Sequence, residues 1–524
     1  MSDPIAIVDL FSGPGGLGEG FSSCRGSDGA RRYQINLSIE KEPSAHKTLR
    51  MRAFLRQFQI FPSEYYAWLN GKSAEPAWSV LFPGEWAAAE DEARCLELGT
   101  PECTSFLQER IRAIRTQHDG RTILIGGPPC QAYSLAGRSR NSGIVGYEAE
   151  LDHRNFLYDE YVNVLGALAP AAFVMENVKG MLSAAIKGNA IFSKVMEDLR
   201  NAGGDDSYRL FALTPATGRR SEDPRPQDFV VRTEEHGVPQ ARHRVIIVGL
   251  RKDVIDGVPD HLLPLLKRRE QVVNVSMAIG AMPRMRSGVS RSDSGPNWVA
   301  TMDEAIRKVK VTLATLSPPD REAMLQELQG VETEFRSMVS RGGTIEGGLV
   351  LPNDCPADLL AWLTDPSLSR LPQNETRGHM PSDLARYLFA ACYGRVFGTS
   401  PKAADFPAAL APQHRNWTSG KFSDRFRVQV AGRPSTTITS HISKDGHYFI
   451  HPDPSQCRSL TVREAARLQT FPDNYIFLGN RTEQYVQVGN AVPPFLAQQI
   501  AEALIPVFDT LDAKMRVYAA VPAQ

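Results

Sequence analysis

A stiff turn that follows a short apolar run is the feature that most constrains this chain. Thr122–Ile125 has the composition of a buried strand, and Gly126–Ser134, with the sequence GGPPCQAYS, follows it directly. Active-site residues of open α/β sheets gather at the carboxyl ends of the strands, and paired prolines fix the backbone angles that direct Cys130 outward. A small buried cysteine is the alternative, but it does not explain the glycines and prolines before it. The turn predicts an α/β enzyme with Cys130 as its nucleophile.

A second turn, near the N-terminus, predicts a site for a nucleoside-type cofactor. The strand-like run Ile5–Leu10 leads into Gly13–Gly18, whose glycines have the G-x-G-x-x-G spacing. A further apolar run, Ile35–Ile39, ends in Glu40 about twenty residues later, where a carboxylate can bind the two hydroxyls of a ribose. The glycines alone would also fit a flexible loop. The strand that ends in Glu40 favours the cofactor site.

The charge balance excludes a general attraction to nucleic acid. The 524 residues are enough for two or three domains, and their formal net charge is zero. Any contact with nucleic acid must therefore come from local basic patches. Arg209–Arg291 contains 15 Lys and Arg against 9 Asp and Glu, and Arg415–Asp445 contains 6 against 2. A solvated charged face would show the same bias, so the patches alone leave both interpretations open.

The cysteines and the N-terminus predict a cytoplasmic protein. Seven cysteines without a C-x-x-C pair argue against a disulfide framework or a thiolate zinc site. Met1–Pro4 has no basic leader, and no apolar run approaches the roughly eighteen residues of a membrane helix. His441, His447 and His451 have spacings that fit no helical pair of metal ligands, so we expect no metal there.

The order of strand-like and helical stretches along the chain predicts two domains. Strand-like and helical stretches alternate from Ile5 to Leu250, which is the pattern of a doubly wound α/β sheet. Residues 301–341 look helical and charged, with a break at Ser317–Pro319, and 342–435 is rich in proline, glycine and turns. We therefore predict a catalytic domain at 1–250, a second, smaller domain at 251–430, and a C-terminal segment at 431–524 that returns to the first.

Six segments resemble, in the same order, the motifs of the DNA (cytosine-5) methyltransferase family. They are Asp9–Gly16, Pro128–Gln131, Glu176–Val178, Gln240–Arg244, Arg463–Asp473 and Gly489–Pro494. They frame almost the whole chain, although about 45–120 and 250–430 match no signature. The resemblance implies a Rossmann-like S-adenosylmethionine-dependent methyltransferase sheet, with target recognition by 251–430. It also implies that a final helix, Phe495–Phe508, completes the cofactor pocket.

The resemblance implies methyl transfer to carbon 5 of a cytosine that is flipped out of a specific duplex DNA sequence. Carbon 5 is not nucleophilic until a thiolate, here that of Cys130, adds to carbon 6. Glu176, next to Asn177 at a strand end, would share a proton with the third ring nitrogen. A surface carboxylate is the alternative interpretation of Glu176. Arg242 and Arg244 alternate along a strand, so they are expected on one face, where the family holds the cytosine ring and the catalytic loop; two solvated arginines are the alternative.

The implied cofactor is S-adenosylmethionine, with its amino-acid tail at the glycine turn, Phe11 against the adenine and Glu40 on the ribose. Two positions depart from the family pattern. Lys41 stands where a bulky apolar residue is common, and Thr100 stands where an Asp usually binds the adenine amino group. The complete set of predicted cofactor-binding residues is Phe11, Gly13, Pro14, Gly15, Gly16, Leu17, Glu40, Lys41, Thr100, Gly127, Pro129, Leu157, Asn490 and Ala491.

The expected partner is double-stranded DNA, read in the major groove by 251–430. The basic loop Gly137–Gly146 would close over the flipped base. We expect a monomer without a membrane partner, and the sequence leaves open whether a cognate restriction or defence system is a second partner. An RNA cytosine-5 methyltransferase of the same fold and a non-catalytic DNA-binding module are alternatives. A nicotinamide-dependent oxidoreductase would use the same glycine turn, but it leaves Cys130 and Glu176 unexplained.

Overall fold

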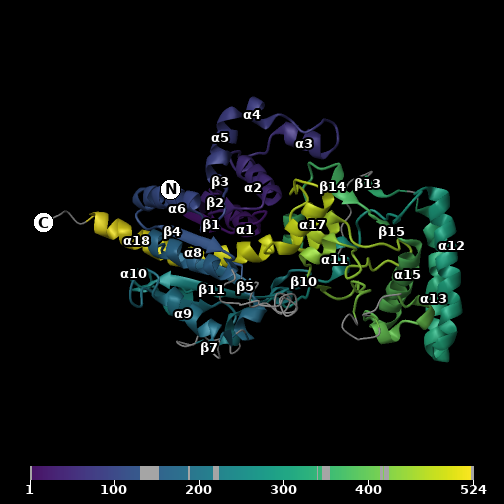
Figure 1. The fold of residues 1–524 in the computed structure, drawn as a ribbon. Helices are drawn as coiled ribbons and strands as arrows, with labels where there is room; N and C mark the ends of the chain where they lie inside the picture. The colour runs from purple at the N-terminus through teal and green to yellow at the C-terminus, as the bar shows by residue number, and fades with distance from the viewer. Residues whose placement is uncertain are drawn as a thin grey trace.

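The computed structural model describes residues 3–129, 153–183, 185–186, 189–215, 224–338, 340–344, 354–412, 417 and 424–520. Figure 1 shows a larger part built on a central sheet, a smaller part rich in helices, and a junction between them. The longest helix, α18 (Pro494–Ala520), runs from the junction along the sheet. The chain therefore ends on the part that contains the sheet.

The central sheet has eight strands in the order β3-β2-β1-β4-β5-β11-β8, with β9 beside β11. The first five in this order are parallel. The cores of β1 and β4 are buried on both faces, which explains their continuous apolar sequences. The strands are β1 Ile5–Leu10, β2 Tyr33–Glu40, β3 Ala93–Cys95, β4 Thr122–Gly126, β5 Ala172–Val178, β8 Tyr208–Ala212, β9 Val230–Arg232 and β11 His243–Arg251.

One strand modifies the predicted doubly wound sheet. β11 runs antiparallel to β5, so that Arg244 lies opposite Val178 and Leu250 lies opposite Ala172. A pattern of alternating elements predicts strands but not their directions, so this reversal is visible only in the structure. An antiparallel strand begins where its parallel neighbours end. The first residues of β11 therefore lie at the carboxyl edge of the sheet, where the ends of β4 and β5 also lie.

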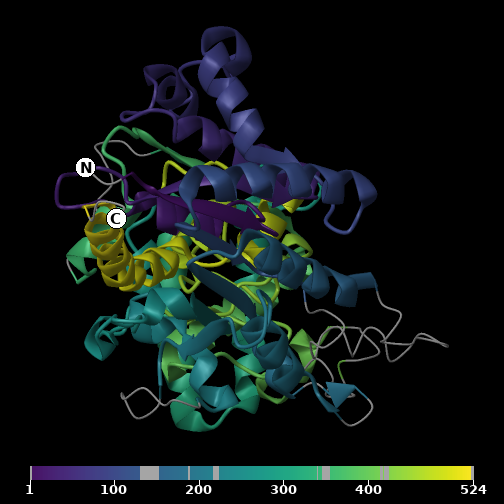
Figure 2. The same ribbon diagram turned by 90° about the vertical axis from the view of Figure 1, so that its left-hand side faces the viewer.

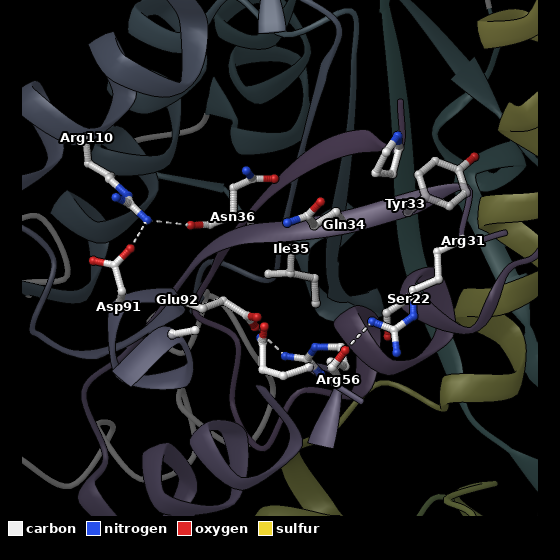
Figure 3. A pocket seen from close by; sticks show the side chains of 13 residues that line it. Ser22, Arg31, Tyr33, Gln34, Ile35, Asn36, Arg56, Asp91, Glu92 and Arg110 are labelled. Carbon is white, nitrogen blue, oxygen red and sulfur yellow. Dashed lines mark hydrogen bonds and ion pairs between the residues drawn. The ribbon is translucent and has the colours of Figure 1, made fainter. Parts of the chain in front are cut away.

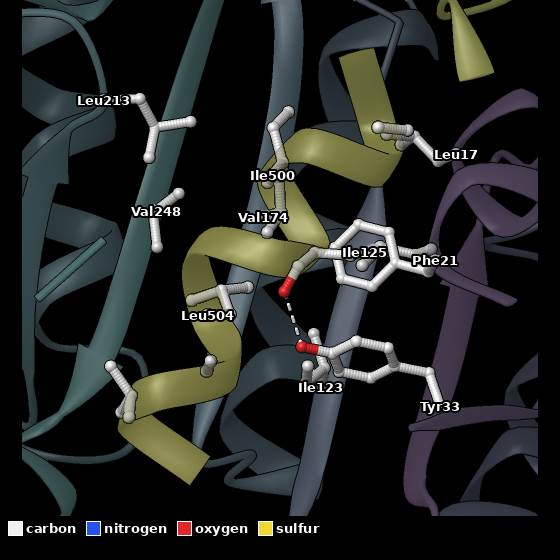
Figure 4. Packing of buried hydrophobic residues seen from close by; sticks show 14 of the residues in the cluster. Leu17, Phe21, Tyr33, Ile123, Ile125, Val174, Leu213, Val248, Ile500 and Leu504 are labelled. Atoms are coloured by element: carbon white, nitrogen blue, oxygen red, sulfur yellow. Dashed lines mark hydrogen bonds between the residues drawn. The ribbon is translucent and has the colours of Figure 1, made fainter. Parts of the chain in front are cut away.

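Helices cover both faces of the sheet. On one face, α1 (Gly16–Ser23) and α18 pack over β1, β4 and β5, and the Tyr33 hydroxyl donates to the Ala501 carbonyl at 2.7 Å. Figure 4 shows Phe21, Ile500 and Leu504 in this apolar layer. On the other face lie α6 (Pro101–His118), α8 (His153–Leu168) and α9 (Ile191–Arg200). Figure 2 shows α18 in yellow and the blue helices α6 and α8 on opposite sides of the sheet.

The predicted terminal helix is confirmed, and it is longer than 495–508. This region also contradicts the expectation that no apolar segment is as long as a membrane helix. Among the described residues, the helical stretch Arg481–Arg516 is long and apolar enough to cross a membrane, by length and composition only. However, 67% of its most apolar window is buried inside the protein. Packing against the sheet accounts for that composition.

The segment between β2 and β3, which matches no sequence signature, forms a helical insertion with an aromatic core. It contains α2 (Pro43–Leu55), α3 (Ser63–Leu69), α4 (Trp78–Leu81) and α5 (Pro83–Glu92). Phe54 lies at the centre of this core, with its ring 5.2 Å from that of Trp78. The Tyr66 hydroxyl donates to Asp365 Oδ2 at 2.7 Å. The insertion therefore bridges the sheet and the 251–430 region.

The smaller part has its own apolar core, formed mainly by α12 (Gly295–Thr312), α13 (Pro318–Glu334) and α15 (Pro381–Phe397). The predicted break at Ser317–Pro319 is confirmed, because Pro318 begins α13, and proline is favoured at a first helical position. The expectation of irregular structure over 342–435 is wrong for α15, which has 17 residues and is mostly buried. The core also includes Ile450 and Cys457, which lie beyond the predicted boundary at 430.

The junction is built on buried ion pairs. In α16 (Val462–Leu468), Glu464 accepts two hydrogen bonds from Arg458 at 2.6 and 2.7 Å, and Arg467 pairs with Asp473. Burial opposes ionisation of Glu464, but Arg458 outweighs it and lowers the pKa of Glu464 to about 2. Removing one partner of such a pair typically costs about 3 to 5 kcal/mol. The Arg463–Asp473 motif therefore supports the junction between the two parts.

The remaining helices and strands are short and connect these layers. They are β6 Ala185–Ile186, β7 Asn189–Ala190, β10 Gln240–Ala241, α10 Lys252–Ile255, α11 Val275–Ile279, β12 Gly288–Val289, β13 Gly342–Thr344, α14 Ala357–Leu363, β14 Arg370–Glu375, β15 Gly378–His379, β16 Ser435–Thr436 and α17 Arg481–Asn490.

Candidate active site

The turn after β4 and the end of β5 are held together by Asn177. Its Nδ2 donates to the Pro128 carbonyl at 3.0 Å, and its Oδ1 accepts the Val178 N–H at 2.8 Å. A Cβ added to Gly127 would lie 3.1 Å from Glu176 Oε2, so glycine lets the turn pass close to this carboxylate. The predicted nucleophile, Cys130, lies outside the described residues. The half-buried Pro129, the last described residue of the turn, leads directly to it.

Glu176 and Arg244 form an ion pair at the carboxyl edge. Arg244 Nε lies 2.9 Å from Glu176 Oε1, and the two side chains are 15% and 13% exposed, Arg244 first. Their backbone positions are fixed by the antiparallel register, in which Ile246 lies opposite Glu176 and Arg244 is two residues away on the same face. The guanidinium orients the carboxylate without closing the site, since Oε2 lies beside Gly127.

Arg242 lies near this pair, since its charge interacts with those of Arg244 and Glu176, and a shared face for both arginines stays a prediction. Arg242 lies between β10 and β11, and it is almost completely buried. Its Nη1 donates to the carbonyls of Ile438 and Gly489 at 2.9 and 3.2 Å. Its guanidinium therefore reaches the C-terminal segments. Arg242 thus ties the Gln240–Arg244 motif to the last motif, while Arg244 contacts Glu176.

The glycine turn after β1 is joined to the end of β2 through Glu40. The Gly13 and Glu42 N–H groups donate to its two carboxylate oxygens at 2.7 and 2.8 Å. Burial raises the pKa of Glu40, and these two N–H groups partly counter that effect. Gly13 and Gly15 have φ of +56° and +98°, which other residues adopt only with strain. The structure therefore brings the predicted glycines and the predicted ribose carboxylate together.

The last motif closes the other side of the glycine turn. A Cβ added to Gly16 would lie 2.3 Å from the Val492 carbonyl, so the two backbones are in direct contact. The Tyr475 hydroxyl also donates to the Pro14 carbonyl. Ala491, next to Val492, is buried, whereas Asn490 is exposed, and Leu17 faces the apolar layer under α18. These contacts bring the predicted C-terminal and N-terminal cofactor residues to one place.

The residues predicted to lie near the adenine fall into two groups in the structure. Phe11, with a strained φ of +55°, packs in the same apolar cluster as Leu157 and Leu98. Thr100 instead caps α6, where its Oγ1 accepts the Cys103 N–H at 3.3 Å.

Lys41 lies nearby on the surface, where its Nζ is 3.4 Å from Glu97 Oε1. The structure thus brings Leu98 and Glu97 to this region, and neither was among the predicted contacts. Both follow β3, a strand too short for sequence periodicity to reveal.

Asp9, at the end of β1, is a further residue that the motif alone did not single out. Its side chain is fully buried, and neither carboxylate oxygen has a hydrogen-bond partner among the described residues. Burial raises the pKa of Asp9 to about 8, although the Ser12 hydroxyl and Arg56 act in the opposite direction. A Cβ on Gly18 would lie 3.3 Å from Asp9 Oδ2, which places this carboxyl beneath the glycine turn.

The six described cysteines are free thiols. Burial raises the pKa of Cys24 to about 12 and that of Cys103 to about 11. A reactive thiolate needs the opposite shift. His447 and His451, which the sequence places close together, have different partners. His447 Nδ1 lies 2.8 Å from the Tyr387 hydroxyl, while His451 Nδ1 accepts the Asp453 N–H. Within the described residues, no group of three potential ligands could hold a metal ion.

The mixed sheet, with a glycine turn and a carboxylate at its carboxyl edge, defines a Rossmann-like methyltransferase fold. The solved structure of a DNA modification methyltransferase encoded within an Escherichia coli prophage has the same fold. It matches with a TM-score of 0.51 at 17% identity, covering 96% of this chain and 99% of that one.

Sequence comparison identifies the family within this fold. The family model for C-5 cytosine-specific DNA methylases matches residues 101–506. The type II methyltransferase M.Bpa9945I of Bacillus paralicheniformis is 32% identical over 516 residues, covering 95% of this chain and 98% of the relative. The type II methyltransferase M.DdeI of Desulfomicrobium norvegicum is 25% identical, covering 97% and 90%. This chain belongs to the C-5 cytosine-specific DNA methylase family, and it is a DNA (cytosine-5-)-methyltransferase.

Proposed function

We propose that this enzyme transfers a methyl group from S-adenosylmethionine to carbon 5 of a cytosine flipped out of a specific duplex DNA sequence, through a covalent adduct with Cys130. The observation that carries the proposal is the Glu176–Arg244 pair beside the Gly127–Pro129 turn that leads to Cys130. A carboxyl group oriented in this way is suited to donate a proton to the ring nitrogen of the base, or to share one with it.

The residues around the glycine turn fit S-adenosylmethionine. When bound, this cofactor supplies an electrophilic methyl group. Glu40 has two oxygens and about four lone pairs, of which backbone N–H groups occupy two, so it can still accept the ribose hydroxyls. Phe11 and Leu157 would hold the adenine in their apolar cluster. Ala491 and the exposed Asn490 would close the pocket over the amino-acid tail.

In the proposed reaction the Cys130 thiolate forms a bond to carbon 6 of cytosine, which moves an electron pair toward carbon 5. Glu176 donates or shares a proton at the third ring nitrogen, where negative charge develops, and Arg244 keeps its carboxyl group in position. Carbon 5 would then take up the methyl group as the bond between that methyl and the cofactor sulfur breaks, which leaves S-adenosylhomocysteine. Loss of the carbon 5 proton and departure of the thiolate restore the carbon 5–carbon 6 double bond.

A cavity of about 680 Å³ beside the Gln240–Arg244 motif supports a DNA substrate. It is lined by Arg425, Arg427 and Lys444 of the predicted basic segment, together with three threonines. Asp424 and Asp445 also line it and pair with the two arginines, so DNA phosphates would compete with these carboxylates. The Thr437 hydroxyl donates to the Ala241 carbonyl at 2.7 Å, which fixes this wall next to the catalytic edge. Guanidinium, ammonium and hydroxyl groups are the usual partners of DNA phosphates. We infer that a strand carrying the target cytosine passes here.

Fluorinated DNA tests the mechanism. If Cys130 adds to carbon 6, duplex DNA with 5-fluorocytosine at the target will be methylated and then remain bound, because fluorine does not leave as a proton does. Denaturing gels should show a covalent complex that requires S-adenosylmethionine. Cys130→Ser should abolish it, and Glu176→Gln should slow it about a hundredfold or more.

Cofactor binding, measured separately for both variants, is the control, because neither side chain is proposed to contact S-adenosylmethionine. An equal cross-link in Cys130→Ser would contradict the mechanism. A cross-link to RNA but not to duplex DNA would favour the RNA alternative. Bisulfite sequencing of host DNA with and without the protein would then identify the methylated sequence, against which a cognate restriction enzyme could be sought.

A further inference from the structure

A series of polar contacts joins the helix after the glycine turn to the 251–430 region. Glu19, in the first turn of α1, accepts hydrogen bonds from the Arg52 guanidinium on α2, and the two side chains are 5% and 10% exposed, Arg52 first. Arg52 Nη1 also donates to Asn474 Oδ1 at 3.3 Å. Asn474 Nδ2 in turn donates to Asp365 Oδ2 at 2.7 Å. The contacts therefore begin beside the predicted cofactor turn and end in a region that carries none of the six motifs.

The residue after Asn474 contacts the glycine turn directly. The Tyr475 hydroxyl donates to the Pro14 carbonyl, and the Tyr475 ring centre lies 4.5 Å from the guanidinium carbon of Arg52. A Cβ added to Gly15 would lie 3.1 Å from the same hydroxyl. The position of Asn474 thus bears on two supports of the turn, the Tyr475 hydroxyl and the Arg52–Glu19 pair.

Asp365 decides which way the side-chain amide of Asn474 points. An amide has an oxygen that accepts and an NH2 group that donates, whereas a guanidinium only donates and an ionised carboxylate only accepts. Burial opposes ionisation of Asp365, but hydrogen bonds from Asn474 and Tyr66 outweigh it and lower the pKa of Asp365. The carboxylate therefore keeps the NH2 group of Asn474 on its own side, which leaves Oδ1 to accept from Arg52.

Other contacts hold the surrounding main chain in place. One turn after Arg52, Arg56 pairs with Glu92 at the end of α5, and the two side chains are 10% and 9% exposed, Arg56 first. Figure 3 shows this pair in the wall of a cavity beside β2. The Tyr65 hydroxyl donates to the main-chain carbonyl of Asn474 at 2.6 Å. Loss of the Asp365 carboxylate should therefore release the side chain of Asn474 and leave α2 where it is.

We propose that Asp365 is a positioning residue for the glycine turn, so that the 251–430 region helps to set the affinity for S-adenosylmethionine. The inference rests on the proposed cofactor site. Without the carboxylate, the Asn474 amide is free to turn its NH2 group toward Arg52, where two donors would face each other. The guanidinium then loses its fixed orientation between Glu19 and the Tyr475 ring. A turn that is less well ordered before binding pays more to bind the cofactor.

Calorimetric titration of the full chain with S-adenosylmethionine tests this inference, with Asp365→Ala and Tyr66→Phe as a matched pair. Both variants remove a hydrogen bond at Asp365 Oδ2, since the Tyr66 hydroxyl donates to the same oxygen at 2.7 Å. Asp365→Ala should weaken binding by about 2- to 12-fold, the range that one hydrogen bond contributes. Tyr66→Phe should keep the wild-type affinity, because Asp365 still holds the Asn474 amide. Melting temperatures of both variants show that they are folded.

Asn474→Ala separates positioning from general stability. By itself it should weaken binding at least as much as Asp365→Ala does. If Asp365 acts through Asn474, the double variant should bind no more weakly than Asn474→Ala alone. Amide hydrogen exchange of residues 15–19, measured without cofactor, should be faster in Asp365→Ala than in Tyr66→Phe.

Three results would overturn the proposal: wild-type affinity in Asp365→Ala, an equal loss of affinity in Tyr66→Phe, or additive losses in the double variant. Each of them leaves the proposed function intact, because the wild type still binds the cofactor. A wild type that bound no S-adenosylmethionine would contradict the proposed function and the positioning role together.

Discussion

At the scale of single residues, the site depends on where two strands meet. The motifs predicted Glu176 and Arg244 from separate parts of the sequence, and the antiparallel register of β5 and β11 brings them to 2.9 Å. Arg242 belongs to the same motif, and its Nη1 donates to the main-chain carbonyls of Ile438 and Gly489 in the C-terminal segments. Residue type therefore predicted the participants, and backbone geometry decided which of them contact each other.

Asp9 provides a prediction about pH and stability. Its folded pKa of about 8 lies above the roughly 3.9 of an unfolded Asp, so the folded state binds the proton more tightly. The resulting stabilisation is complete below about pH 4 and is lost as the pH rises toward 8. Between about pH 5 and 7.5 its loss should approach about 1.4 kcal/mol per pH unit. Asp9→Asn should remove this contribution.

Urea unfolding of the wild type and of Asp9→Asn at a series of pH values checks this slope. The difference in the free energy of unfolding between the two proteins should change steadily with pH and level off above about pH 8. Parallel pH profiles would show that Asp9 titrates normally in the folded protein.

At the scale of helices and strands, the predicted cofactor site is assembled from both ends of the chain. α1 begins at the glycine turn and α18 begins at the last motif, and the two helices pack so closely that Cβ atoms on Gly16 and Gly20 would meet α18 or its preceding turn. The glycine spacing thus serves two purposes, the tight turn at Gly13–Gly15 and the close approach of two backbones.

Gly16→Ala should therefore disturb the site through packing. Its Cβ would lie 2.3 Å from the Val492 carbonyl, and a main-chain atom cannot move aside as a flexible side chain can. Overpacking of this kind costs about 1 to 3 kcal/mol. To the extent that cofactor binding bears this cost, the affinity for S-adenosylmethionine should fall by about 5- to 150-fold. Calorimetric titration measures it. Gly84→Ala in α5, where a Cβ meets nothing within 4 Å, should bind the cofactor normally.

At the scale of the whole molecule, separate apolar cores form the sheet, the aromatic insertion, the junction and the smaller helical part. The insertion between β2 and β3 bonds to Asp365 through Tyr66, while Asn474 Nδ2 donates to the same Asp365 oxygen at 2.7 Å. The two parts are thus joined by polar contacts and by shared apolar clusters, since Ile279 and Leu371 pack with Leu460 in the junction. An exchange of one part must therefore preserve these apolar contacts.

We propose that the 251–430 region selects the DNA sequence, because the predicted catalytic motifs lie outside it. Exchanging this region with that of a related methyltransferase should transfer the methylated sequence, as read by bisulfite sequencing. An exchange of 251–457 should give the more stable chimera, because Ile450 and Cys457 belong to the same apolar core. A chimera that kept the recipient's target sequence would contradict the assignment.

The sequence by itself determined the enzyme class, the sheet, the glycine turn with Glu40, and the terminal helix. Each of these depends on local chemistry: strand composition, residues required by a tight turn, and motifs whose order is written along the chain. Only the tertiary structure decided the direction of β11, the different roles of Arg242 and Arg244, the helix α15, and the buried state of Asp9. These depend on contacts between residues far apart in sequence, and a one-dimensional pattern records neither strand direction nor the loss of solvent around a side chain.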